Sequence, residues 1–281
     1  MPRVLACLAD SPRAQAVARA AQQWARTLGA DLTYLHVAED QLAAQRWTQQ
    51  GGGEIERAQG AEVVVEHGDP SSAICRIAEQ KQVDLVVLGA LEQEKLVTSI
   101  MGSVARRVAR RAPCSVLLLT DPNKAAVQKI VTSVSFDKQS EAMLRFVLQL
   151  ARAYQVEALH VIHEYDAYSG LLRMLGHGEV PPKANSQDYV ELSEEAAMEQ
   201  LSTFLFKFDF DDLPVHAECL DGHIGQEAVE FAQRQRADLL VIPSPPRLSF
   251  WDRFFKHPAE LAMQHLPCSL LLYRTSKEQA L

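Results

Sequence analysis

The chain has 281 residues, of which 47% are apolar and 23% are charged, and its formal net charge is −8. This length favours two domains, and the acidic balance argues against general nucleic-acid binding, because neutralising phosphates requires a basic surface. Five cysteines without a dense framework indicate a reducing compartment, and no apolar run reaches bilayer length, so we expect a cytoplasmic protein.

Strand-like and helix-like segments alternate through the first half of the chain. Apolar residues recur at helical spacing up to Leu28, where Gly29 closes the segment as a C-cap. The predicted strands are Arg3–Leu8, Asp31–Val37, Ala61–Glu66, Val83–Leu88 and Ser115–Leu119, and the predicted helices are Ser11–Leu28, Gln41–Trp47, Glu54–Ala58, Ser71–Lys81 and Val104–Arg111. This alternation predicts an α/β fold with an open, mainly parallel sheet and helices on both faces.

The connection between the strand at Val83–Leu88 and the helix at Val104–Arg111 is a candidate anion site. Gly89 ends the strand, and Gly102 and Ser103 stand directly before the helix. A glycine lets the backbone approach a ligand, a serine caps a helix, and the amides of the first helical turn favour a phosphate. The alternative interpretation of such a Gly-Ser pair is an ordinary helix cap.

The same stretch recurs 154 positions later in the chain. VDLVVLGA at residues 83–90 matches ADLLVIPS at 237–244, and APCSVLLL at 112–119 matches LPCSLLLY at 266–273. Leu35-His36-Val37 also aligns with Leu159-His160-Val161, and Gly68 with Gly222. The chain is therefore predicted to be an internal duplication of two α/β units, 1–122 and 123–281, divided in the polar connection Asp121–Lys124.

The second unit departs from the first at several points. Its predicted elements include strands at Val127–Ser135, Glu157–Ile162 and Ser269–Tyr273 and helices at Gln139–Tyr154 and Ser193–Phe206. An insertion at 163–187 either covers a ligand or a partner or forms a plain surface loop. The aromatic stretch Leu248–Phe255 either binds a lipidic or aromatic ligand or a partner, or packs beneath its loop.

Gly89, Glu92 and Gly102-Ser103 are separated by two and nine residues. This spacing resembles the signature of the universal stress protein family, in which glycine, two residues, glycine, nine residues and glycine-serine or glycine-threonine wrap the phosphates of ATP. Together with the duplication, the chain resembles a tandem member of that family over nearly its whole length. Glu92 replaces the second glycine, and its charge and bulk oppose phosphate binding.

The resemblance implies a site for ATP or a related adenine nucleotide, with Mg²⁺, in the first unit. The implied cofactor-binding residues are Ala9, Asp10, Val37, Gly89, Gly102, Ser103 and Val104. In the family an aspartate after the first strand reaches ribose or metal, and alignment places Ala9 in that slot with Asp10 beside it. The alternative role of Asp10 is a helix cap or a solvated turn. In the second unit the loop positions are Pro243, Pro246, Lys256 and His257, so we expect no nucleotide there.

We therefore expect a noncatalytic stress-response or regulatory protein. The alternatives are a nucleotide-free module for protein or small-ligand interaction and a slow ATP hydrolase. In the family, the last strand of each unit pairs two units, so we expect the two halves to pair within one chain. A larger homodimer through other faces is a further expectation.

Other chemistry-bearing residues have plainer interpretations. His163 and His177 reach a common metal only if the insertion folds back, and the repeated Cys114 and Cys268 are expected to pack. The four arginines of one helical run are expected to form a solvated helix face rather than a nucleic-acid or phosphate patch: Arg106, Arg107, Arg110 and Arg111.

Overall fold

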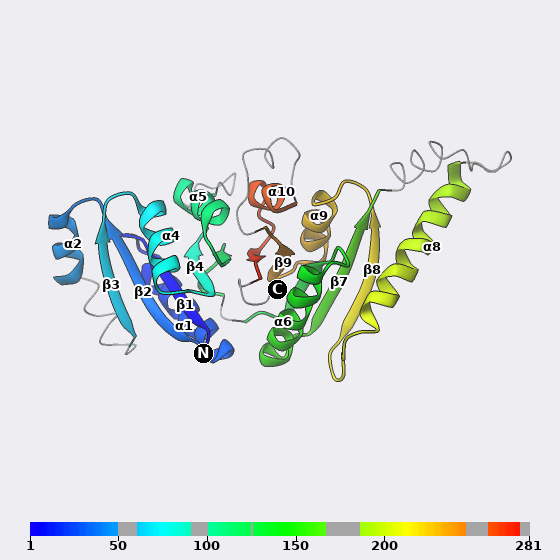
Figure 1. Cartoon of the computed structure of the whole chain (residues 1–281), viewed down its shortest axis with the longest axis horizontal. Helices are drawn as coiled ribbons and strands as arrows, with labels where there is room; N and C mark the ends of the chain where they lie inside the picture. The colour runs from blue at the N-terminus through cyan, green and yellow to red at the C-terminus, as the bar shows by residue number, and fades with distance from the viewer. Residues whose placement is uncertain (50–60, 91–100, 125, 167–185, 246–257, 276–281) are drawn as a thin grey trace.

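The computed structural model describes residues 1–49, 61–90, 101–124, 126–166, 186–245 and 258–275, and the side chains of 186–193 are left out of this description. Ten strands form one sheet in the order β3-β2-β1-β4-β5-β10-β9-β6-β7-β8 (Figure 1). Their bounds are β1 Arg3–Leu8, β2 Asp31–Ala38, β3 Glu62–His67, β4 Leu85–Gly89, β5 Ser115–Leu119, β6 Lys129–Ser133, β7 Ala158–Tyr165, β8 Val215–Asp221, β9 Leu239–Pro243 and β10 Ser269–Tyr273. Each half thus has the same strand order, and the expected α/β fold with a mainly parallel sheet is confirmed.

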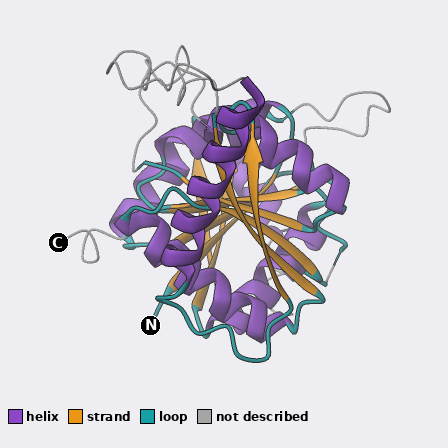
Figure 2. Ribbon diagram, turned by 90° about the vertical axis from the view of Figure 1, so that its right-hand side faces the viewer, coloured by secondary structure: helices purple, strands orange, loops and turns teal. Residues whose placement is uncertain are grey.

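Helices cover both faces of the sheet, as Figure 2 shows along its edge. Apolar side chains of α4, α5, α9 and α10 pack on one face, and those of α1, α6 and α8 pack on the other. The helices are α1 Ala14–Leu28, α2 Gln41–Trp47, α4 Pro70–Gln80, α5 Ser103–Arg111, α6 Lys138–Tyr154, α8 Ser186–Leu205, α9 Gln226–Gln235 and α10 Pro258–Gln264. Each apolar cluster contains residues of both halves, so the two cores are continuous.

Several element bounds differ from the predictions. Helix α1 begins at Ala14 rather than Ser11, because the amide of Ser11 donates to the carbonyl of Ala9 and forms a turn first. Strand β7 continues to Tyr165 because its pairing with β8 extends to Asp221. Helix α8 starts earlier than predicted, at Ser186. The predicted helix Glu54–Ala58 lies outside the described residues.

The alignment of His36 with His160 is wrong, and the counterpart of His36 is His163. His36 Nδ1 donates to the carbonyl of Leu8 at 2.8 Å, and His163 Nδ1 donates to the carbonyl of Val134 at 2.9 Å. His160 instead contacts Phe231 of α9, on the opposite face of the sheet. The identical tripeptide Leu-His-Val caused the error. A shift of three residues along a strand turns a side chain to the other face.

The two halves are joined through β5 and β10, which pair antiparallel with Leu117 opposite Leu271. This confirms the expectation that the last strand of each half pairs within one chain. At either end of the pair a serine contacts the opposite strand: Ser115 Oγ accepts from the amide of Arg274 at 3.0 Å, and Ser269 Oγ accepts from that of Thr120 at 3.4 Å.

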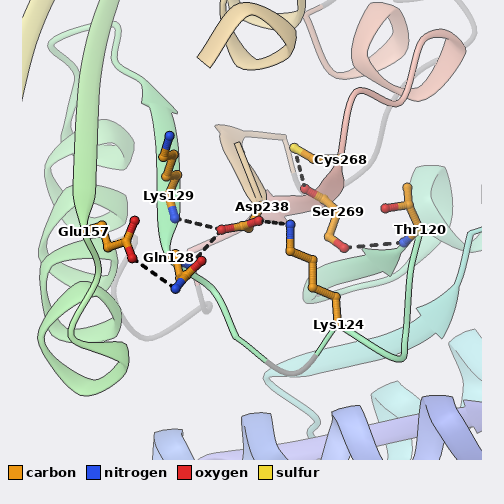
Figure 3. A network of polar contacts seen from close by, with 8 residues as sticks. All are labelled: Thr120, Lys124, Gln128, Lys129, Glu157, Asp238, Cys268 and Ser269. Atoms are coloured by element: carbon orange, nitrogen blue, oxygen red, sulfur yellow. Dashed lines mark hydrogen bonds and ion pairs between the residues drawn. The ribbon is translucent and has the colours of Figure 1, made fainter. Parts of the chain in front are cut away.

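The connection between the halves is fixed by a half-buried aspartate. Asp238 accepts from the amides of Gln128 and Lys129 at 2.7 and 2.8 Å and pairs with Lys124 (Figure 3). These bonds and the charge of Lys124 hold the pKa of Asp238 below its usual value although burial opposes this shift. In the first half Asp84 accepts from the amide of Arg3 at 2.8 Å in the same way. The repeated Val/Ala-Asp-Leu motif is therefore structural.

Candidate functional site

The carboxyl ends of β1, β2 and β4 lie side by side, because β1 pairs in parallel with both neighbours. Ala9 and Asp10 follow β1 directly and are exposed, Val37 is half-buried in β2, and Gly89 ends β4. Parallel α/β sheets bind ligands outside this edge. The structure thus brings these four predicted residues to one edge of the sheet.

The start of α5 is held directly beyond β4 by backbone hydrogen bonds. The amide of Ala90 donates to the carbonyl of Leu119 at 2.8 Å, and the amide of Gly102 donates to the carbonyl of Ala90 at 2.9 Å. The two ends of the connection therefore meet. Glu92, within this connection, lies outside the described residues.

Gly102 occupies the N-cap position of α5, one residue earlier than expected from the sequence. Ser103 is the first helical residue and is exposed, whereas Val104 packs partly against the apolar core. Amides of a first helical turn have no acceptor within the helix, so this end of α5 favours an anion. The helix thus brings Ser103 and Val104 to the same edge as Gly89.

An aromatic stack lies on the α1 side of this edge. Trp47, the last residue of α2, stacks on the buried His36 with ring centroids 4.2 Å apart and an interplanar angle of 5°. Burial lowers the pKa of His36, and the bond to Leu8 and the charge of Asp10 oppose that shift. Asp10 does not cap α1, because the N-cap residue of α1 is Arg13 and no side chain makes a capping hydrogen bond there. A flat ring surface therefore stands beside the end of β2.

An ion pair links α4 and α5 at the same edge. Asp69 caps α4 by accepting from the amide of Ser72 at 2.9 Å and from Ser71 Oγ at 2.7 Å, and it pairs with Arg107 at 3.2 Å. The two serine contacts, and then the charge of Arg107, lower the pKa of Asp69 to about 2. This pair thus ties the start of α4 to α5.

The corresponding edge of the second half is filled by its own side chains. Glu164 is 6% exposed and replaces Val37. It accepts from Ser133 Oγ at 3.0 Å and from the amides of Gly225 and Ala228 at 2.7 and 2.9 Å. Burial raises the pKa of Glu164, and these three bonds oppose the shift. Its carboxyl group therefore occupies the start of α9.

Aromatic rings complete this filling. Phe136 stands where the first half has Asp10, and its ring lies 4.1 Å from that of His163 and 5.4 Å from that of Phe204. Lys256 and His257 lie outside the described residues, as do Pro246 and the stretch Leu248–Phe255.

The remaining candidates have structural roles. Burial raises the pKa of both Cys114 and Cys268 to about 12, as expected for packed thiols. No group of three histidine, cysteine, aspartate or glutamate side chains is placed to hold a metal within the described ranges. His163 bonds to Val134, and His177 lies outside those ranges.

The arginine run of α5 is only partly a solvated face. Arg110 pairs in bidentate fashion with Glu260 of α10, with both contacts at 2.6 Å, and Arg107 pairs with Asp69. Helix α5 carries arginines where its counterpart α10 carries Glu260, and the contact between Arg110 and Glu260 across the two halves explains this difference.

The model of the universal stress protein family matches residues 45–120 and 126–274. The chain belongs to the universal stress protein family. The two matched segments fit a tandem member. A curated universal stress protein of Methanocaldococcus jannaschii is 40% identical over 57 residues, which are 20% of this chain and 34% of that relative. The chain thus spans about a third of the length of the curated relative it matches.

Two solved structures share the fold of this family member over nearly its whole length. A functionally unknown protein of Pseudomonas aeruginosa PAO1 has a TM-score of 0.70 and 18% identity, covering 98% of this chain and 94% of its own. A universal stress protein of Archaeoglobus fulgidus has a TM-score of 0.67 and 13% identity, covering 96% and 98%. At these identities the likeness shows the fold alone. No helix among the described residues is long and apolar enough to cross a membrane.

Sequence reasoning missed two residues near the site, Asp69 and Trp47, and one at the corresponding edge of the second half, Glu164. The capping role of Asp69 could have been predicted from the sequence, because an aspartate before Pro70 and two serines is typical of a helix start. The stacking of Trp47 on His36 could not have been predicted, because it depends on where α2 packs. The correspondence of Glu164 with Val37 was missed because aligning His36 with His160 is wrong by three residues.

Proposed function

We propose that the first half binds ATP or a related adenine nucleotide, with Mg²⁺, and that the protein is a noncatalytic stress-response or regulatory protein. The observation that carries this proposal is the hydrogen bond from the Gly102 amide to the Ala90 carbonyl. It sets the start of α5 directly beyond the end of β4, at the edge of the sheet where β1 and β2 also end, and a nucleotide at this edge can reach helix amides and strand ends together.

The side chains at this edge suit a nucleotide. Ala9 is small and exposed and Gly89 is only half-buried, so the backbone at the ends of β1 and β4 can be approached from outside the sheet. Asp10 supplies an exposed carboxylate, which can accept hydrogen bonds from ribose hydroxyls and coordinate Mg²⁺. Arg107, which pairs with Asp69, stands one turn along α5 from Ser103. The backbone of Val37 is the proposed adenine contact, with the Trp47 ring nearby.

The second half is proposed to bind no nucleotide. The carboxyl group of Glu164 already accepts the amides at the start of α9, and Phe136 replaces the carboxylate. The start of α9 corresponds to that of α4, so Glu164 and Phe136 occupy the positions of the proposed adenine and ribose contacts. At the phosphate loop, Pro243 replaces Gly89 and offers no backbone N–H. The second half is thus proposed to be a scaffold, and a nucleotide-free module for protein or small-ligand interaction remains the alternative for the whole protein.

The test compares an isosteric pair at the start of α5. Asp at position 103 suits a helix start, so folding is preserved, but its carboxylate repels phosphate. We expect Ser103→Asp to lose most ATP–Mg affinity in calorimetric titration and Ser103→Asn to keep it. Equal ATP affinity in both variants would show that no phosphate group binds at this position. If the wild-type protein releases inorganic phosphate from ATP faster than the Ser103→Asp variant does, the protein is instead a slow ATP hydrolase.

Two further substitutions follow from the sequence pattern. Replacing Gly102 with a bulky residue is expected to abolish ATP binding, and Glu92→Gly is expected to strengthen it by removing charge and bulk. Unchanged or weaker binding in Glu92→Gly would contradict the proposed effect of this side chain.

We also propose a unit boundary between Pro122 and Asn123. A turn at Asp121, whose carboxylate accepts from the Asn123 amide at 3.0 Å, supports it. Cleavage at a protease site inserted there should leave the halves associated through β5 and β10 on gel filtration. Assembly into a larger homodimer stays a prediction, which light scattering tests.

A further inference from the structure

The carboxyl-terminal end of α5 is held by a buried arginine of the other half. Arg274 directly follows β10 and is 4% exposed. Its Nη1 donates to the carbonyls of Ala112 and Cys114, both at 3.1 Å, and its Nη2 donates to that of Ala109 at 2.5 Å. A helix leaves its last carbonyls without internal donors and with partial negative charge there. The guanidinium therefore caps α5.

The same guanidinium is fixed within its own half. Its Nε donates to the carbonyl of Pro245 at 2.8 Å, and Nη2 donates to Ser244 Oγ at 3.2 Å. Ser244 and Pro245 follow β9, where the first half begins its loop toward the proposed phosphate position. Arg274 thus joins the end of α5 to the corresponding turn of the second half.

A second contact holds α5 to α10, which lies next to it near the middle of the molecule (Figure 1). Both oxygens of Glu260 accept from Arg110, at 2.6 Å each, and Glu260 is 4% exposed. Bidentate pairing fixes orientation as well as distance. Removing one partner would leave the other as an uncompensated, largely buried charge.

Neither contact follows from the duplication itself. The counterpart of Arg274 in the first half is Thr120, and that of Glu260 is Arg106. The second half therefore holds α5 with side chains that the first half does not carry at the matching positions.

We propose that the second half acts as a brace for α5, in which Arg274 and Glu260 position the helix whose other end forms the phosphate side of the nucleotide site. This inference rests on the proposed function. Helix α5 has nine residues and is about 14 Å long, so a tilt at one end displaces the other. Nucleotide affinity in the first half thus depends on second-half side chains that touch no nucleotide.

The experiment uses the full chain and a charge exchange. ATP–Mg affinity is measured by calorimetry, well below the unfolding midpoint, for Arg110→Glu, Glu260→Arg, the double exchange, Arg274→Met and Arg274→Lys. We expect each single reversal and Arg274→Met to weaken affinity about tenfold, a common size for coupling between sites. The double exchange should recover most of it, and Arg274→Lys, which keeps the charge but has one nitrogen in place of the three that donate here, should recover part of it.

A matched control tests whether reversing a charge elsewhere in the protein also changes ATP affinity. Lys207, which follows α8, pairs with Glu141 of α6 on the opposite face of the sheet from α5, and Lys207→Glu should leave affinity unchanged. Hydrogen exchange across Ser103–Val108 gives a second readout, with faster exchange expected in Arg274→Met.

The outcomes separate the two proposals. Wild-type affinity in Arg274→Met and both single reversals, with unchanged exchange in α5, would overturn the brace. If the wild-type chain binds no ATP, the proposed function fails, and faster exchange in α5 of the variants would still support the brace. Unchanged exchange would then overturn it as well.

Discussion

Leu117 pairs with Leu271, its own counterpart in the other half, at the centre of the β5–β10 pair. A local twofold relation therefore passes between these two residues. Both side chains are 0% exposed, so the point where the halves meet is also the centre of a continuous core. The pairing of the halves depends on apolar burial as much as on strand hydrogen bonds.

A lysine at this point should loosen the halves. Leu117→Lys or Leu271→Lys places an ammonium group among buried apolar side chains, and we expect a loss of about 3–5 kcal/mol in unfolding free energy. Urea denaturation measures the loss, and faster proteolysis near Asp121–Lys124 reports separation. Leu42→Lys is the control, because Leu42 is 69% exposed. Equal stability of the Leu117→Lys and Leu42→Lys variants would contradict a shared core.

Glu164 should be needed for its oxygens rather than its charge. Glu164→Val, which restores the residue type at Val37, leaves the amides of Gly225 and Ala228 and the Ser133 hydroxyl without their acceptor. We expect a loss of about 2–4 kcal/mol, from the cost of unpaired buried donors. Glu164→Gln keeps one acceptor oxygen and should lose less. A valine variant as stable as wild type in thermal denaturation would show that these bonds contribute nothing.

Gly225 should tolerate no side chain. Its φ is +91°, and an added Cβ would lie 2.6 Å from Pro258 Cα, which is backbone and cannot turn aside. We expect Gly225→Ala to lose more than about 2 kcal/mol, whereas Gly29→Ala, with φ +58° and nothing within 4 Å of the added Cβ, should lose about 1 kcal/mol. Chemical denaturation compares the two, and similar losses would argue against the clash.

Stability should fall in mild acid through His163. Burial lowers its pKa, so the folded state binds fewer protons than the unfolded state. Unfolding free energy therefore falls as pH drops below about 6.5, the unperturbed value. His163→Asn keeps an N–H donor for the Val134 carbonyl but does not titrate. We expect a smaller loss than in wild type between pH 7.5 and 5.5, and identical pH profiles would contradict this role.

Local patterns in the sequence predicted the strands, most helices and the duplication, because burial and glycine placement act over short distances. The edge formed by Asp10, Val37 and Gly89 followed from parallel strand order. What could not be predicted depends on contacts between distant segments. The sequence predicts a solvated Arg110, because nothing near it in the sequence indicates that Glu260, 150 residues away, lies opposite it.

The most direct test of a nucleotide site confined to the first half is photolabelling with 8-azido-ATP and Mg²⁺, followed by peptide mapping. We expect one labelled region, the tryptic peptide of residues 27–46 that contains Val37, with labelling suppressed by excess ATP. Labelling confined to second-half peptides, or labelling that ATP does not suppress, would contradict it.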